Sequence, residues 1–205
     1  MFRFIRTATI CLAVGILGAT VFSQSRSTGE IKRIDILVKT IERYTRENRE
    51  KIVVADVSDF DKGTPVWKLF DSEQALDKYR EGSETYTIAL NWQRNGKIVA
   101  SNFTLFSPSG DWSKFVFHYF RPDGSLALAR SELRTFEGEY TVKEDRYFDS
   151  RGRLLKRTIQ YFDLATGKPK KPTKELRDDN PSLYKVDYFL NVNKLPFAKL
   201  ISQKR

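Results

Sequence analysis

Cysteine, histidine and methionine each occur only once in the 205 residues of this sequence. Cys11 lies inside an N-terminal apolar run, so the chain that follows this run cannot form a disulfide and must be stabilised by packing alone. His118 is the single histidine and cannot by itself supply a histidine-rich metal site. The sequence also has no phosphate-binding glycine loop and no nucleophile elbow, and we expect neither a cofactor nor a bound metal.

The N-terminal segment has the order of a secretory signal. Arg3 and Arg6 precede an apolar run from Ala8 to Phe22, and Ser23 follows it. We therefore predict that residues 1–23 are a signal peptide and that the chain is a bacterial periplasmic or secreted protein. The alternative is a retained membrane anchor, although a run of about fifteen apolar residues is shorter than the roughly twenty that span a bilayer. Residues 24–205 are expected to form a single β-rich domain.

Basic residues outnumber acidic ones, 36 against 26, which gives a formal net charge of +10, or +8 without Arg3 and Arg6. A basic surface attracts nucleic acids, anionic lipid headgroups or acidic polysaccharides. Because export argues against nucleic acid, we expect no nucleic-acid partner. The densest basic stretch, residues 168–174, is broken by prolines. We expect it to be a solvated linker, with a peripheral contact to a membrane surface as the alternative.

Glycine recurs at a regular spacing in the second half of the chain. Five glycines follow one another at intervals of fourteen residues and a sixth comes one residue late: Gly96, Gly110, Gly124, Gly138, Gly152 and Gly167. Because one strand of about nine or ten residues and a turn of about four fill this interval, residues 84–163 are predicted to form an up-and-down β-meander.

The predicted fold class is α+β, with N-terminal helices packed on an antiparallel sheet of six or more strands, either open or curled into a half-barrel. We predict that residues 27–82 form an N-terminal part of helical and mixed structure, and that residues 164–205 form a linker and a C-terminal segment. Ser27 and Glu30 have the spacing of a capping box, and apolar residues then recur at helical spacing as far as Tyr44. A second helix is predicted over 71–81, with strands over 51–57 and 64–70. Residues 184–190 resemble a strand, and 195–201 are ambiguous.

Turn chemistry predicts which strand residues share a face of the sheet. Asn95-Gly96 is a two-residue hairpin signal, which pairs Trp92 with Val99. The alternation of side chains, carried through the later turns, places His118 on one face and four apolar residues on the other. These four residues are Trp92, Phe103, Phe117 and Leu128.

Charged residues continue the apolar face beyond Leu128. The predicted register places Glu132 opposite Lys143 and Arg130 opposite Asp145, and it brings Arg157 beside Asp145. One interpretation is a charged patch on a concave apolar surface, suited to a ligand with an apolar body and an anionic or hydroxyl-rich head. The other is a solvated sheet edge with ordinary ion pairs. The candidate ligand-binding residues are therefore Trp92, Phe103, Phe117, Leu128, Arg130, Asp145 and Arg157.

Two resemblances suggest functions of different classes. A helix followed by a broad antiparallel meander after an export signal resembles the architecture of bacterial periplasmic carriers of outer-membrane lipoproteins, without a shared residue motif. This resemblance implies a carrier of an apolar or lipid ligand. The segments Tyr-Phe-Arg-Pro-Asp-Gly at 119–124 and Tyr-Phe-Asp-Ser-Arg-Gly at 147–152 resemble the hairpin-repeat units of bacterial envelope and toxin-system proteins. This second resemblance implies a structural module that binds another envelope protein.

A third hypothesis is a hydrolase that uses paired carboxylates, Glu132 with Glu144 or with Asp145, as acid and base. Charged residues on strands are more often solvated than catalytic. We therefore favour an exported envelope protein that binds a ligand or partner without catalysis.

Overall fold

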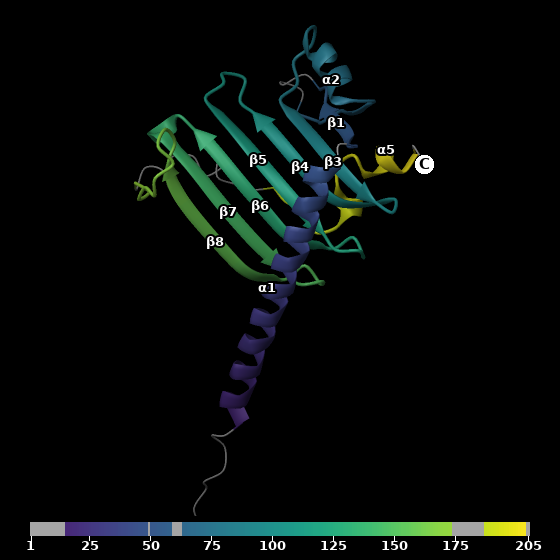
Figure 1. Ribbon diagram of the computed structural model, residues 1–205. Helices are drawn as coiled ribbons and strands as arrows, with labels where there is room; N and C mark the ends of the chain where they lie inside the picture. The colour runs from purple at the N-terminus through teal and green to yellow at the C-terminus, as the bar shows by residue number, and fades with distance from the viewer. Residues whose placement is uncertain (1–14, 49, 59–62, 174–186, 204–205) are drawn as a thin grey trace, which may run out of the picture.

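A computed structural model describes residues 15–48, 50–58, 63–173 and 187–203 (Figure 1). Its helices are α1 (Gly15–Glu47), α2 (Glu73–Arg80) and α5 (Ala198–Gln203), with short 3-10 helices η2 (Glu137–Glu139) and η3 (Val192–Lys194). Its strands are β1 (Ile52–Asp56), β2 (Trp67–Phe70), β3 (Thr87–Arg94), β4 (Lys97–Phe106), β5 (Trp112–Phe120), β6 (Leu126–Thr135), β7 (Tyr140–Phe148) and β8 (Leu154–Asp163).

The strands form one open antiparallel sheet in the order β2-β1-β3-β4-β5-β6-β7-β8. Strands β3 to β8 follow one another along the chain, which confirms the predicted meander. The six regularly spaced glycines all lie outside the strands, Gly138 within η2, with φ between 66° and 85°, a left-handed conformation that glycine adopts without a steric penalty. The sheet does not close into a barrel.

Most of the predicted helices and short strands are present, but α1 differs from its prediction. The chain is already helical from Gly15, so Ser27 lies inside α1 and the predicted capping box is wrong. The apolar residues before Ser27 continue the helix, and Glu30 instead pairs with Arg33 and Arg121. Helix α2 begins at the N-cap Ser72, and β1 and β2 occupy the two predicted strand regions.

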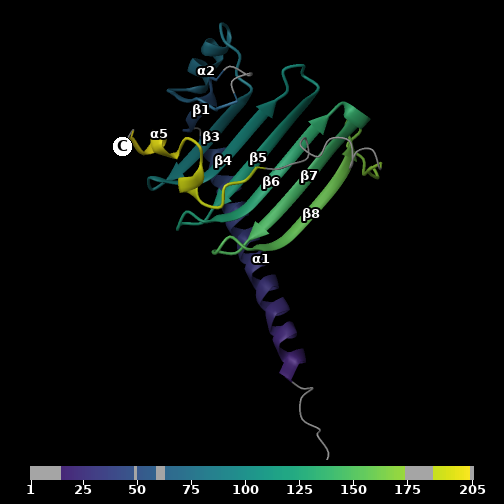
Figure 2. The same cartoon turned by 180° about the vertical axis from the view of Figure 1, so that it is seen from behind.

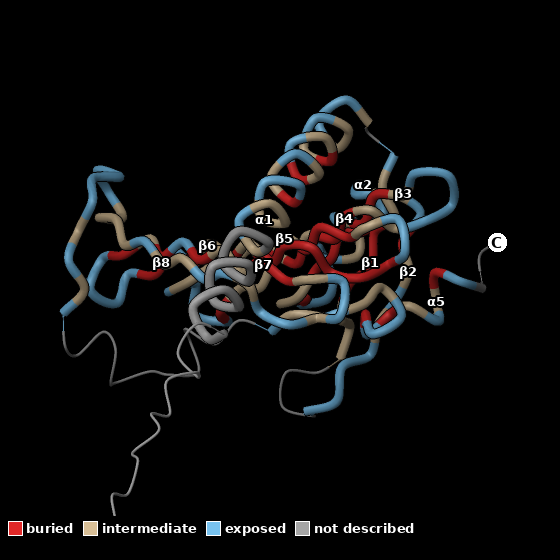
Figure 3. Tube along the Cα trace, turned by 90° about the horizontal axis from the view of Figure 1, so that it is seen from below, coloured by how far each residue is buried: buried red, intermediate tan, exposed pale blue. Residues whose placement is uncertain are grey.

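Two layers cover the two faces of the sheet. Helix α1 crosses one face of the sheet, here called the helix-side face (Figures 1 and 3). Helix α2 packs against β1 through Leu76. Residues 187–203, the C-terminal segment, cover part of the opposite face, here called the back face (Figure 2). The strand predicted over 184–190 is absent from 187–190, and residues 184–186 lie outside the described residues. Of the ambiguous residues 195–201, those from Ala198 onward belong to α5.

Each layer has its own apolar core. Beneath α1, buried residues of the helix pack on buried residues of four strands: Ile34, Val38 and Ile41 on Trp92, Tyr119, Leu128 and Tyr147. On the back face, the C-terminal segment packs on the sheet through Leu195, Phe197 and Ile201, which join a core containing Phe103, Val116 and Phe148. The core beneath α1 lies at the end of the sheet where the turns after β3, β5 and β7 are found.

Three β-bulges at this end decide which residues share a face. The register shifts occur at Trp92/Gln93, at Tyr119/Phe120 and at Tyr147/Phe148. Since a bulge inserts one extra residue into a strand, every residue beyond it changes face. Trp92 therefore pairs with Ala100 instead of Val99, and Phe103 lies on the back face while Trp92 lies under α1. The prediction that they share a face is wrong.

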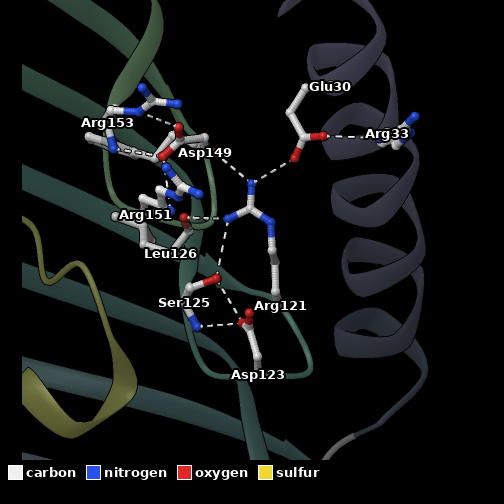
Figure 4. A network of polar contacts seen from close by, with 10 residues as sticks. Glu30, Arg33, Arg121, Asp123, Ser125, Leu126, Asp149, Arg151 and Arg153 are labelled. Carbon is white, nitrogen blue, oxygen red and sulfur yellow. Dashed lines mark hydrogen bonds and ion pairs between the residues drawn. The ribbon is translucent and has the colours of Figure 1, made fainter. Parts of the chain in front are cut away.

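Arg121 connects α1 to two hairpins (Figure 4). Its guanidinium donates hydrogen bonds to the backbone carbonyl oxygens of Leu126, at 2.7 Å, and of Phe148, at 2.6 Å. The same group pairs with Glu30 of α1 at 3.4 Å, and its side chain is only 13% exposed. Arginine suits this position because its several fixed N–H donors reach acceptors on different elements at once.

The basic stretch is partly folded rather than a free linker. Pro169 lies opposite Phe162 in an isolated β-bridge, and the N–H of Lys170 donates to the carbonyl of Tyr161 at 3.0 Å. The ammonium of Lys170 also donates to the carbonyl of Gly138. Residues 168–170 therefore shield one end of the outer edge of β8, which limits pairing with other chains there.

Replacing Gly124 tests the packing of the C-terminal segment. A Cβ at Gly124 would lie 2.9 Å from a methyl group of Val192, whereas a Cβ at Gly110 meets nothing within 4 Å. Both glycines have positive φ, so either alanine variant carries backbone strain of about 1–2 kcal/mol. We expect Gly124→Ala to lower the free energy of unfolding by about 1 kcal/mol more than Gly110→Ala, because it also overpacks this contact. Equal losses in urea titrations would contradict this packing.

A second prediction concerns His118, which is fully buried on the back face beside Phe103, Phe120 and Phe189. Burial lowers its pKa to about 4, and the nearby backbone of Ser101 offsets this only in part. Between about pH 6.5 and 4 the unfolded chain binds a proton here that the folded chain does not. The free energy of unfolding should therefore fall by roughly 3 kcal/mol as the pH decreases through this window.

The control for this prediction is His118→Phe, which removes the titrating group and keeps an aromatic ring in the core. Its free energy of unfolding should lack this component of the pH dependence, whatever its absolute stability. Chemical denaturation of both proteins at a series of pH values measures the difference. Parallel profiles would show that His118 does not change its proton affinity on folding.

Candidate functional site

A groove of about 680 Å³ lies on the helix-side face, between the C-terminal part of α1 and strands β5 to β8. Helix α1 covers the end of the face near the turns after β3, β5 and β7, and it leaves the rest of these strands uncovered (Figure 1). The groove lies in this uncovered part. Its walls come from segments that are distant in the sequence, so only the packing of α1 on the sheet creates it.

The floor of the groove is aromatic. Phe115, Phe117 and Tyr119 alternate along β5 and therefore point to the same side of the sheet. Phe117 stacks on Tyr119, with ring centroids 6.0 Å apart and an interplanar angle of 17°. Tyr119 is buried at the edge of α1, whereas Phe115 and Phe117 stay partly exposed. These two phenylalanines offer an accessible apolar surface.

One wall of the groove is an ion network between α1 and the sheet. Arg130 donates to both carboxylate oxygens of Asp145, at 2.9 and 3.1 Å, and to Glu42 of α1 at 2.7 Å. The predicted pairing of Arg130 with Asp145 is confirmed. Glu42 also accepts a hydrogen bond from the hydroxyl of Tyr119. Burial, together with this carboxylate, raises the pKa of Tyr119 above its usual value, so the hydroxyl keeps its proton.

The remaining charges give the rim an excess of positive charge. Glu132 pairs with Arg134 at 2.7 Å and with Lys143 at 3.4 Å, and the predicted opposition of Glu132 and Lys143 is confirmed. One carboxylate is thus shared by two cations. In the described part of the chain, Arg46 of α1 lines the groove without an ion-pair partner. The groove therefore carries four basic and three acidic side chains.

The structure brings together three of the seven predicted site residues, Phe117, Arg130 and Asp145. Trp92 and Leu128 share their face but are buried beneath α1. The other two predicted residues lie on the back face, so the seven do not form a single site.

Arg157 and Phe103 are the two predicted site residues that lie on the back face. The bulge at Tyr147/Phe148 places Arg157 opposite Arg146, and its guanidinium donates to Glu144 at 2.6 Å instead of approaching Asp145. The prediction for Arg157 is wrong for the same physical reason as the prediction for Phe103. His118 lies on the back face with Phe103, whereas the alternation placed these two residues on opposite faces.

Glu132 and Glu144 also lie on opposite faces, since Glu132 pairs with Lys143 and Glu144 is opposite Ser131. They cannot act together as an acid and a base on one substrate. Burial alone would raise the pKa of Glu144, but hydrogen bonds from Arg157 and Arg146 outweigh burial and lower its pKa. Glu144 is therefore a charged structural residue of the back face.

Sequence reasoning missed the contribution of α1 to the groove. Glu42 meets Arg130 across 88 residues of chain, and no local pattern marks such a contact. Arg46 was missed for the same reason. Phe115 was not identified as a site residue, although its alternation with Phe117 along one strand could have indicated it.

No family model matches the sequence, and comparisons with curated proteins and with solved structures find no significant match. In the described ranges, no group of three or more histidine, cysteine, aspartate and glutamate side chains is arranged to hold a metal ion. None of the helices in the described part of the chain is both long enough and apolar enough to span a bilayer.

Neutralising the adjacent carboxylates of β7 tests the difference between the two faces. The side chain of Glu144 is 6% exposed and contacts two arginines, whereas Asp145 pairs with Arg130, whose side chain is 40% exposed. We expect Glu144→Gln to lower the free energy of unfolding by about 2 kcal/mol, because the buried amide leaves Arg146, whose side chain is 18% exposed, and the more exposed Arg157 without a charged partner. Asp145→Asn should cost less than about 1 kcal/mol, because solvent screens this pair. The reverse order in urea titrations would contradict the assigned burial.

Proposed function

We propose that this chain is a non-catalytic binding protein that acts outside the cytoplasm and holds an amphiphile with an anionic head in the groove. The observation that carries the proposal is the partly exposed phenylalanine floor next to a rim with excess positive charge. Binding sites for small amphiphiles combine an apolar surface with a few placed polar groups. The part of the helix-side face that α1 leaves uncovered supplies both the apolar surface and the polar groups.

The residues suggest how such a ligand would lie. Its apolar body would cover Phe115 and Phe117, which removes apolar area from water. Its anionic head would lie near Arg46 and Lys143. Arg46 has no ion-pair partner in the described chain, and Lys143 shares the carboxylate of Glu132 with Arg134. Since the groove is open and buries only part of a ligand, we expect dissociation constants of about 1–100 μM.

The proposed location rests on the N-terminal residues, where a basic stretch precedes an apolar run. Glu30 of α1 pairs with Arg121, and the hydroxyl of Tyr44 donates to the carbonyl of Gln93; these contacts and those between them lie beyond the expected cleavage after Ser23. Cleavage would therefore leave these contacts intact. The mass of the protein purified from the periplasmic fraction of a bacterial host tests this part of the proposal.

A second candidate function is a protein-interaction module, and the repeated hairpins favour it. The segments at 119–124 and 147–152 have a bulge at the same place, between a tyrosine that packs under α1 and the phenylalanine that follows it. In this case a partner protein would cover the groove in place of a small ligand. The apolar floor would then be one part of a larger interface.

Displacement of an anionic naphthalene sulfonate dye distinguishes these functions. We expect dodecanoate to displace the dye at least about tenfold more effectively than dodecyltrimethylammonium, because the rim is positive. Lys143→Glu should weaken dodecanoate binding severalfold, whereas Lys194→Glu, an equal charge change away from the groove, should leave it unchanged. Phe117→Thr should weaken all three ligands. If dodecanoate displaces no dye, or if the two lysine variants behave alike, the ligand-binding proposal is wrong.

A further inference from the structure

The two sides of α1 carry opposite charges. Glu30, Asp35 and Glu42 face the sheet, where Glu30 and Glu42 pair with Arg121 and Arg130, and Asp35 accepts a hydrogen bond from Tyr147. The basic residues of the same helix segment are exposed to solvent: Lys32, Arg33, Lys39, Arg43 and Arg46. Glu47 in the last turn is the exposed acid of this segment. The outer side of α1 therefore has a clear excess of positive charge.

This outer side is a continuous stripe. Lys32, Ile36, Lys39, Arg43 and Arg46 follow one another at alternating intervals of four and three residues, which places them along one line of the helix. Ile36 is 66% exposed at the second of these positions. In the described chain the four basic residues of the stripe have no ion-pair partner, whereas Glu30 and Glu42 of α1 already pair with Arg121 and Arg130. Within the described residues, no ion pair therefore engages the stripe.

We propose that this outer stripe of α1 docks the protein on an anionic lipid surface. Basic side chains near a membrane are attracted by anionic headgroups, and an exposed aliphatic residue among them enters the headgroup region. The charge of the stripe and the position of Ile36 both fit this partner. Arg46 belongs to the stripe and also lines the groove, so docking would place the groove opening close to the lipid surface. The stripe itself does not depend on a ligand in the groove.

The docking test measures binding of the purified protein to vesicles of phosphatidylcholine with 30% phosphatidylglycerol, and to vesicles of phosphatidylcholine alone. The test variant is Lys39→Glu/Arg43→Glu in the stripe. The matched control is Lys194→Glu/Lys199→Glu, which makes the same charge change at exposed residues of the C-terminal segment on the back face. All four positions are exposed, so the unfolding midpoints should stay close to that of the parent protein. If the stripe variant fails to fold, Lys39→Gln/Arg43→Gln replaces it.

We expect binding to the anionic vesicles only, with a decrease as salt rises. Each basic residue near the surface contributes about fivefold to partitioning, so the stripe variant should bind at least about 25-fold more weakly. The control should stay within about twofold of the parent protein. Ile36→Ser should weaken binding severalfold without changing the lipid preference. These outcomes do not depend on dodecanoate binding, so the two proposals fail independently.

Three results would overturn the docking proposal. The first is equal binding to neutral and anionic vesicles. The second is an equal loss in the stripe variant and the control, which would show a general charge effect. The third is stripe-dependent binding of duplex DNA that is tighter than binding to the anionic vesicles, which would assign the stripe to nucleic acid.

Discussion

The alternation of side chains along the strands, and its interruption by three bulges, is the constraint on which the rest of this structure depends. Each strand exposes successive residues to opposite faces, so a single inserted residue exchanges the faces of all residues beyond it. The bulges at Trp92/Gln93, Tyr119/Phe120 and Tyr147/Phe148 lie at the same end of the sheet. Two separate cores result, one beneath α1 and one beneath the C-terminal segment.

The position of α1 then determines the site. The helix is fixed at several points of the sheet, among them Arg121, Tyr147 and Arg130, and each of these groups meets an acid of the helix. Because these contacts hold α1 over one end of the helix-side face, the other end keeps Phe115 and Phe117 accessible. The same contacts place Glu30, Asp35 and Glu42 of α1 on its inner side and leave its basic residues on the outer side. The groove and the basic stripe are thus two consequences of one interface.

Local patterns predicted the features that depend on neighbouring residues. The glycine spacing gave the meander, and the turn residues gave the opposition of Arg130 with Asp145 and of Glu132 with Lys143. The predictions for Phe103 and Arg157 were wrong because each had to cross a bulge. The prediction that His118 and Phe103 lie on opposite faces was wrong at the turn between β4 and β5, since these strands pair without a register shift. Bulges have no sequence mark here, because the extra residues Val99, Ala127 and Leu155 fit the apolar pattern of their strands. The contributions of Glu42 and Arg46 were missed because they depend on contacts between distant elements.

By itself, the sequence determined an antiparallel meander after a helical start and the opposition of Arg130 with Asp145 and of Glu132 with Lys143. These follow from backbone conformations and side-chain spacings that act over a few residues. Only the tertiary structure decided which face each aromatic residue occupies, which half of the sheet α1 leaves open, and that the acids of α1 point inward. These outcomes depend on register shifts and on packing between segments far apart in the chain, where small differences in fit select one arrangement.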